Sequence, residues 1–138
     1  MARILAIDYG TKRVGLAVTD TNKIIATPLT TVATHLIFEY LNNYLENEKV
    51  ETIVIGDARD LNNLPNPVSH QIELFIKKLV KLYPEIKIKK TDERFSSKMA
   101  SAVIAQIGLP KMKRRDKTLV DKISASIILQ SYLDSNQR

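Results

Sequence analysis

Three acidic residues, Asp8, Glu93 and Asp121, are the side chains in this sequence best suited to chemistry. Asp8 and Glu93 each come at the end of an expected strand, and Asp121 comes in the first turn of an expected helix. Carboxylates crowded together repel one another unless a cation neutralises them. An all-oxygen cluster selects hard Mg²⁺ or Mn²⁺, and two such ions can activate water and stabilise the leaving oxygen of a phosphodiester. The three acids therefore indicate metal-dependent phosphodiester cleavage, provided that the fold brings them together.

Each acid also has a purely structural interpretation. Asp8 is suited to an Asx-turn into Gly10. Glu93 precedes an expected helix, where the positive end of the helix dipole favours an acid. Thr118 and Asp121 match a capping box, in which both side chains bond the first turn of the helix. Taken singly, the structural interpretation is favoured for Asp8 and Glu93, and the two are even for Asp121.

The composition excludes several other classes of chemistry. The chain has 138 residues, no cysteine and only two histidines, so disulfides, iron-sulfur clusters, thiolate zinc sites and a two-histidine metal motif are absent. With 44% hydrophobic residues and no apolar run of about 20 residues, residues 1–138 are expected to form one compact domain that does not cross a membrane. The N-terminus has no secretory signal pattern, so we expect a cytoplasmic protein.

The hydrophobic spacing predicts elements in the order βββ-α-β-α-β-α-α. Alternating or β-branched runs predict strands, and apolar residues three and four apart predict helices. The opening strands are separated by short polar turns, and Pro28 is expected to end the third. The order predicts an α/β fold with a central mixed five-stranded sheet, an antiparallel three-strand meander plus parallel strands, and helices on both faces. The expected strands cover 3–8, 14–19, 24–27, 51–56 and 86–91, and the expected helices 31–48, 68–82, a helix capped by Ser96 or Ser97 that runs to 107, and 118–133.

An excess of positive charge favours a polyanionic partner. The chain has 21 Lys and Arg against 15 Asp and Glu, a net charge of +6. The positive side chains gather at Lys12 and Arg13, at Lys87, Lys89 and Lys90, and in the segment 111–117. Each cluster by itself is most simply a solvated surface.

Three blocks of the sequence resemble the YqgF family, also called RuvX. They are Ile7-Asp-Tyr-Gly-Thr-Lys-Arg-Val-Gly-Leu-Ala-Val-Thr-Asp20, Asp92-Glu-Arg-Phe-Ser-Ser-Lys-Met-Ala100 and Leu119-Val-Asp-Lys-Ile-Ser-Ala-Ser-Ile-Ile-Leu-Gln-Ser-Tyr-Leu133. The resemblance implies a ribonuclease H-like fold and a nuclease that uses one or two Mg²⁺ or Mn²⁺ ions. It assigns catalytic and metal-binding roles to Asp8, Glu93 and Asp121. It suggests that basic residues contact nucleic acid, namely Lys12, Arg13, Arg94, Lys113, Arg114 and Arg115, although Arg94 could instead orient Glu93.

The loop after the fourth expected strand departs from the family pattern. The family commonly has a Gly-Leu-Pro type loop followed by a glycine, whereas this chain has residues 56–63 as GDARDLNN. Asp57 and Asp60 are thereby added as possible further ligands, with solvated loop acids as the favoured interpretation.

Four functions fit these observations. The resemblance favours a nuclease that processes precursor 16S ribosomal RNA, with a pre-ribosomal particle as partner. A Holliday junction resolvase would cut branched DNA and would normally act as a homodimer, whereas the RNA nuclease could be a monomer. A nucleotide-binding ATPase is suggested by the loop Asp8-Tyr-Gly-Thr11, which is also similar to the phosphate loop of actin-like proteins. A catalytically silent RNA-binding module would use the basic surface alone.

Overall fold

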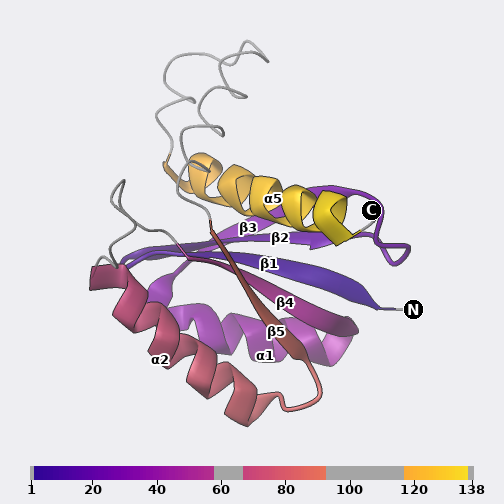
Figure 1. The fold of residues 1–138 in the computed structure, drawn as a ribbon. Coiled ribbons are helices and arrows are strands. Elements are labelled where there is room, and N and C mark those ends of the chain that lie inside the picture. Colours follow the sequence, from indigo (N-terminus) through magenta and orange to yellow (C-terminus); the bar gives the residue numbers. More distant parts are fainter. Residues whose placement is uncertain (1, 58–66, 93–116, 137–138) are drawn as a thin grey trace.

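The computed structural model describes residues 2–57, 67–92 and 117–136. These residues form five strands, two α-helices with a short 3-10 helix between strand and helix, and a long C-terminal helix (Figure 1). The strands are β1 (Arg3–Tyr9), β2 (Arg13–Thr19), β3 (Ala26–Ala33), β4 (Val50–Asp57) and β5 (Lys87–Asp92), and the helices are η1 (Thr34–Leu36), α1 (Ile37–Asn47), α2 (Pro67–Leu82) and α5 (Lys117–Asn136).

The strands form one mixed sheet in the order β3-β2-β1-β4-β5. β1, β2 and β3 pair antiparallel, whereas β4 pairs parallel to β1 and β5 pairs parallel to β4. This arrangement confirms the expected ribonuclease H-like sheet, with an antiparallel meander joined to parallel strands. Because β1 is central, its carboxyl end lies between the ends of β2 and β4.

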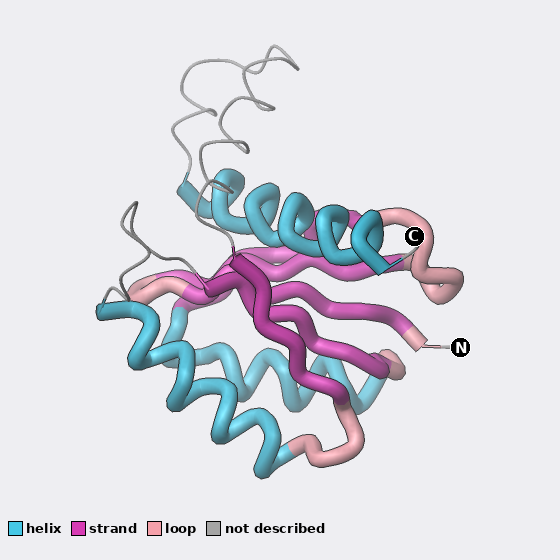
Figure 2. The backbone as a smooth tube through the Cα atoms, viewed as in Figure 1, coloured by secondary structure: helices cyan, strands magenta, loops and turns pink. Residues whose placement is uncertain are grey.

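Helices cover both faces of the sheet, as the sequence predicts. α1 and α2 lie on one face and α5 lies on the other, which gives three layers (Figures 1 and 2). The layer beneath α1 and α2 is packed with large apolar side chains, including Leu5, Ile7 and Phe75. A smaller cluster under α5 contains Ala6, Ala17 and side chains of the helix itself.

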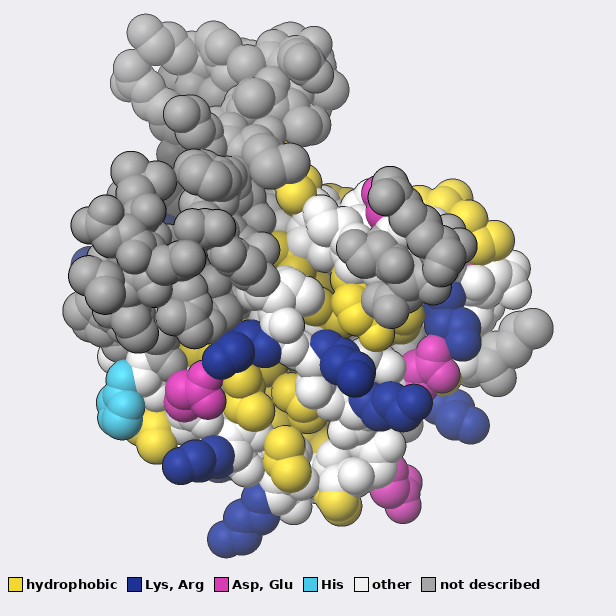
Figure 3. All heavy atoms as spheres, in the orientation of Figure 1, with side chains coloured by type: hydrophobic (Ala, Val, Ile, Leu, Met, Phe, Trp, Pro, Cys, Tyr) yellow, Lys and Arg dark blue, Asp and Glu magenta, His cyan; other side chains and the backbone are white. Residues whose placement is uncertain are grey.

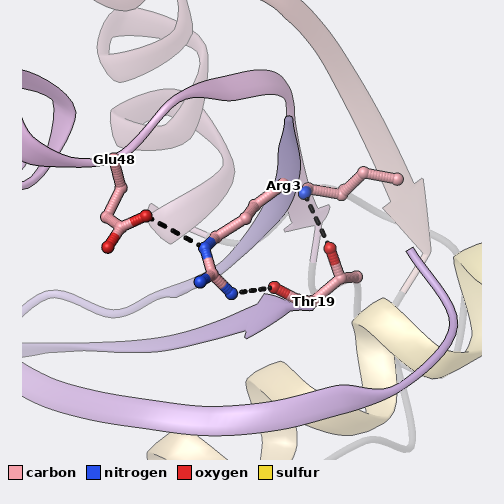
Figure 4. A network of polar contacts seen from close by, with 4 residues as sticks. Arg3, Thr19 and Glu48 are labelled. Atoms are coloured by element: carbon pink, nitrogen blue, oxygen red, sulfur yellow. Dashed lines mark hydrogen bonds and ion pairs between the residues drawn. The ribbon is translucent and has the colours of Figure 1, made fainter. Parts of the chain in front are cut away.

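A polar network fixes the amino end of β1, opposite the candidate site. Arg3 donates from Nε to Glu48 at 3.1 Å and from Nη1 to the Thr19 carbonyl at 2.9 Å (Figure 4). The Thr19 hydroxyl is buried and accepts a bond from the Ile4 amide at 2.9 Å. The contacts join β1 to the end of β2 and to the segment before β4.

The third strand is longer than expected, and this prediction was wrong at both ends. β3 begins at Ala26, continues through Pro28 and reaches Ala33, so the following helical segment starts at Thr34 rather than at Thr31. Pro28 is tolerated because β3 is an edge strand and the register with β2 shifts between Leu16 and Ala17, where a ladder donor is dispensable.

No helix among residues 2–57, 67–92 and 117–136 has the length and apolar character that a membrane span requires. The expected helix from Ser96 or Ser97 to 107 lies outside these described residues.

Candidate active site

Asp8 lies on the face of the sheet that α5 covers. Side chains alternate along β1, and Ile4 and Ala6 belong to the cluster under α5, so Asp8 shares their side of the sheet. In the sheet, Asp8 pairs with Gly15 of β2 and with Gly56 of β4. A carboxylate at the carboxyl end of the central strand is therefore flanked on both sides by residues without a side chain. Asp8 is the last residue but one of β1.

Gly15 allows the backbone of α5 to contact the sheet. A Cβ atom at this position would lie 2.1 Å from the Asp121 carbonyl oxygen and 2.9 Å from the Lys122 amide nitrogen. Neither backbone atom can move without moving the helix. The start of α5 is thus held against the residue that pairs with Asp8, and Asp8 and Asp121 come to the same end of the sheet.

Asp121 is bound by an arginine rather than by the helix end. Arg13 donates from Nε to Asp121 Oδ2 at 2.8 Å, with both side chains partly exposed. Because α5 begins at Lys117, Thr118 lies within the helix and Asp121 follows the first turn, so the capping-box interpretation is wrong. A guanidinium has five N–H donors, and Arg13 can therefore hold Asp121 and still offer donors to a phosphate.

The loop between β1 and β2 presents Lys12 to solvent. Its shape requires Gly10, since a Cβ there would lie 2.6 Å from the Arg13 carbonyl oxygen. Thr34 fixes the loop by donating from Oγ1 to the Gly10 carbonyl at 2.8 Å and from its amide to the Lys12 carbonyl at 3.0 Å. The structure thus brings Lys12 and Arg13 to the end of the sheet that carries Asp8.

Tyr9 belongs to the opposite face. Its ring packs against Phe75 with the centroids 4.8 Å apart, within the layer under α1 and α2. Burial raises the pKa of the Tyr9 phenol above its usual value of 10.0. Tyr9 is therefore a partly buried residue that packs against the core under α1 and α2.

The remaining predicted site residues lie outside the described part of the chain. β5 ends at Asp92, one residue before Glu93. Within 2–57, 67–92 and 117–136, no three His, Asp or Glu side chains are grouped closely enough to hold a metal ion, and the third predicted acid is not in these ranges. The other residues in question are Asp60, Arg94, Lys113, Arg114 and Arg115.

Two features of the site were not predicted from the sequence. Gly15 stands inside the expected strand 14–19, and a glycine inside a strand often marks a close backbone approach, so this signal was available. Ser124, one turn after Asp121, is fully buried, and its hydroxyl has no hydrogen-bond partner in the described structure. No pattern in the sequence indicates that second feature.

Comparison with known proteins identifies the family of the chain. A family model described as RuvX, Holliday junction resolvase, matches residues 2–135. A protein of Christiangramia forsetii named "Putative pre-16S rRNA nuclease" is 51% identical over 133 residues, which cover 96% of this chain and 98% of that protein. A protein of the same name from Porphyromonas gingivalis is 52% identical over 138 residues, the full length of both chains. Among solved structures, YeaZ from Pseudomonas aeruginosa matches 77% of this chain and 50% of its own with a TM-score of 0.46 and 12% identity. Because the family model matches residues 2–135, nearly the whole chain, the chain belongs to the RuvX family.

Proposed function

We propose that this protein is a divalent-metal-dependent nuclease that hydrolyses phosphodiester bonds of precursor 16S ribosomal RNA. The observation that carries the proposal is the close approach of α5 to Gly15, which brings Asp121 to the strand end that holds Asp8. Support for the substrate comes from relatives 51% and 52% identical that are named for that RNA. We propose that the protein acts in the cytoplasm on pre-ribosomal particles.

The oxygen donors at this end of the sheet fit a hard cation. Asp8 and Asp121 are carboxylates, and Glu93, which follows β5 directly in the sequence, is the proposed third ligand. Mg²⁺ or Mn²⁺ at such a site activates water and neutralises charge on the phosphate. The sequence has no cysteine, so no thiolate is available to select a softer metal.

The chain's own basic residues would bind and orient the substrate. Arg13 is anchored by Asp121, so a phosphate that it contacts is held at a fixed position relative to that carboxylate. Lys12 extends from the braced loop as an exposed point charge. Arg94, which follows Glu93 in the sequence, and the group Lys113, Arg114 and Arg115 are proposed to contact phosphates of the substrate.

The test is cleavage of end-labelled precursor ribosomal RNA by the natural protein and by Asp8→Asn, in Mg²⁺, Mn²⁺ or EDTA. We expect metal-dependent cutting that falls at least about 100-fold in the variant, because a bound metal contributes several kcal/mol to stabilising the transition state. Asp134→Asn is the matched control, since Asp134 is an exposed acid of α5 that has no role in the proposed site and accepts a bond from Gln130. Full activity of Asp8→Asn would refute the proposal.

Resolution of four-way DNA junctions is the second candidate, because the matching family model is described as a Holliday junction resolvase. A resolvase cuts two strands symmetrically, which a two-fold dimer would provide. A labelled four-way junction in the same assay separates the two. Preference for the junction, together with a dimer in solution, would replace the ribosomal proposal. RNA binding without cleavage of either substrate would favour the silent binding module, and binding of ATP would favour the nucleotide-binding alternative.

A further inference from the structure

Two lysines of β5 lie on the α5 side of the sheet and have no part in the proposed catalytic site. Ile88 packs into the layer under α1 and α2, so the alternating residues Lys87, Lys89 and Thr91 face the other way. The parallel pairing agrees, since Lys89 is level with Val54, whose side chain belongs to the cluster under α5. The two lysines therefore form a row that runs along β5 toward its carboxyl end.

Within residues 2–57, 67–92 and 117–136, the structure gives no ion pair between the lysines of this row and a carboxylate. Both Lys87 and Lys89 are exposed. Lys90 differs, because it points to the opposite face and pairs with Glu73 of α2. Figure 3, which views the molecule with β5 in front, shows several Lys and Arg side chains with apolar and acidic side chains among them.

A hollow lies beside the two lysines. Lys87 and Lys89 line it from β5, Thr52 from β4, and Tyr132 and Leu133 from α5. Its volume of about 1270 Å³ exceeds the 300 to 1,000 Å³ that is usual for a small-molecule pocket. Its size and open shape fit a segment of a polymer, and Tyr132 offers an aromatic wall of the kind on which bases stack.

Four glutamates also line this hollow, Glu46, Glu48, Glu51 and Glu85, and ion pairs within the described residues involve two of them. Glu48 pairs with Arg3 at 3.1 Å, and Glu51 pairs with Lys23 at 2.7 Å. These pairs leave the lysines of β5 available to a phosphate.

The row leads to the candidate active site. Thr91 pairs with Gly56, and Gly56 pairs with Asp8. At about 3.3 Å per residue, Lys87 and Lys89 are about 6.6 Å apart along β5, and Thr91 is a further 6.6 Å on. The first spacing is comparable to that of successive phosphates in an extended single strand.

We propose that Lys87 and Lys89 hold the backbone phosphates of a single-stranded RNA segment that lies in the hollow and extends along β5 toward Asp8. The inference rests on the proposed function and adds to it the strandedness and the path of the substrate. It assigns positioning, and no chemical step, to the two lysines.

The test measures binding without cleavage. Fluorescently labelled, unstructured single-stranded RNA is titrated in EDTA over a range of salt concentrations. The parent protein carries Asp8→Asn, and the lysine variant carries Lys87→Gln and Lys89→Gln in addition. Each lost phosphate contact reduces the slope of log affinity against log salt by about 0.7 for a single strand. We therefore expect a slope smaller by about 1.4 in the lysine variant. An unchanged slope, no RNA binding by the parent protein, or an equal loss with an RNA duplex of the same sequence would each overturn the proposal.

A charge-matched control distinguishes RNA binding by Lys87 and Lys89 from a general effect of the protein's positive charge. Lys77→Gln plus Lys81→Gln removes the same charge from exposed positions of α2, on the other side of the sheet, and should leave the slope unchanged. Lysines on an edge strand also discourage aggregation, so Lys87→Arg plus Lys89→Arg is needed, and it should retain the natural slope. Cleavage assays on protein with Asp8 intact keep the two proposals distinct. If the RNA is cut but the lysine variant has the same salt slope as its parent, the role proposed for Lys87 and Lys89 is wrong and the nuclease proposal stands. A slope change without any cleavage would reject the nuclease alone.

Discussion

The two faces of the sheet are built from side chains of different size. Along β1, Leu5 and Ile7 point toward α1 and α2, whereas Ala6 and Asp8 point toward α5. β2 repeats the pattern, with Leu16 on the first face and Gly15 and Ala17 on the second. One set of strands thus carries a large apolar surface and a small-residue surface, separated only by the alternation of the chain.

The difference in side-chain size gives the two faces different roles, packing on one and the candidate active site on the other. Large side chains exclude water and contribute about 25 cal/mol for each Å² of apolar surface that they bury, but they keep a helix at a distance. Small side chains bury less area and let the backbone of α5 reach Gly15. The carboxylates therefore stand on the side where the helix can be positioned through its backbone, and the opposite face supplies most of the packing that keeps the sheet rigid.

Leu16→Ala should show the largest effect on stability. Leu16 is fully buried in the layer under α1 and α2. Removing its side chain leaves a cavity, and the free energy of unfolding should fall by about 2 to 5 kcal/mol, as measured by urea denaturation. The protein that remains folded should cleave RNA with an unchanged kcat. A large loss of kcat at full folding would show that the two faces are not separate in function.

Gly15→Ala adds a methyl group at the neighbouring residue, on the face of the sheet that α5 covers. The added Cβ meets the Asp121 carbonyl at 2.1 Å, so α5 must shift. Overpacking of this kind costs about 1 to 3 kcal/mol, and a displacement of about 1 Å at a reacting group reduces the rate about 100-fold. We expect cleavage to fall by that factor in protein that circular dichroism shows to be folded. Equal activity of Gly15→Ala and the natural protein would mean that the approach of α5 does not set the site.

The sheet could be predicted because its information is local in the sequence. The run Glu51 to Gly56 and the alternation at Ile86 and Ile88 specify strands by residue type, and the order of elements then restricts the topology. The extent of β3 could not be predicted, because Pro28 is permitted only by its edge position and by a register shift, which are properties of the assembled sheet.

The sequence predicts residues for the candidate site but not the contacts between them. Family resemblance identified Asp8 and Asp121, but the bond from Arg13 to Asp121 joins residues 108 positions apart. The contact arises from the packing of α5 on β2, and no spacing in the sequence encodes it. From the sequence alone, Asp121 fits a capping box with Thr118 as well as it fits a catalytic site, because the residue at which a helix starts is among the least certain predictions.

Ser124→Ala should have a smaller effect and the opposite sign. The hydroxyl is buried without a partner in the described structure, and an unsatisfied buried polar group costs about 1 to 3 kcal/mol. We expect the free energy of unfolding to rise by about 1 kcal/mol in thermal or urea denaturation. Ser126→Ala is the matched control on the same helix, because Ser126 donates to the Ile123 carbonyl at 2.7 Å and its loss should not stabilise. A destabilised Ser124→Ala would indicate that the hydroxyl has a bonding partner in solution.

The smallest effect concerns pH and again distinguishes the faces. Burial raises the pKa of Tyr9, and it also raises the pKa of Tyr40, Tyr44 and Tyr83, which pack against the same layer under α1 and α2. A phenol whose pKa is higher in the folded state contributes stability that is fully present below the unfolded pKa of about 10 and is lost as the pH rises through the folded pKa. Urea denaturation between about pH 8 and pH 11 should therefore show falling stability, and Tyr9→Phe, which cannot ionise, should reduce the fall.

Because Tyr9 lies on the face opposite Asp8, the same variant should keep its cleavage rate at neutral pH. An identical alkaline loss in the natural protein and in Tyr9→Phe would show that the ring is solvated, and the packing against Phe75 would then contribute little to the rigidity of the sheet beneath the site.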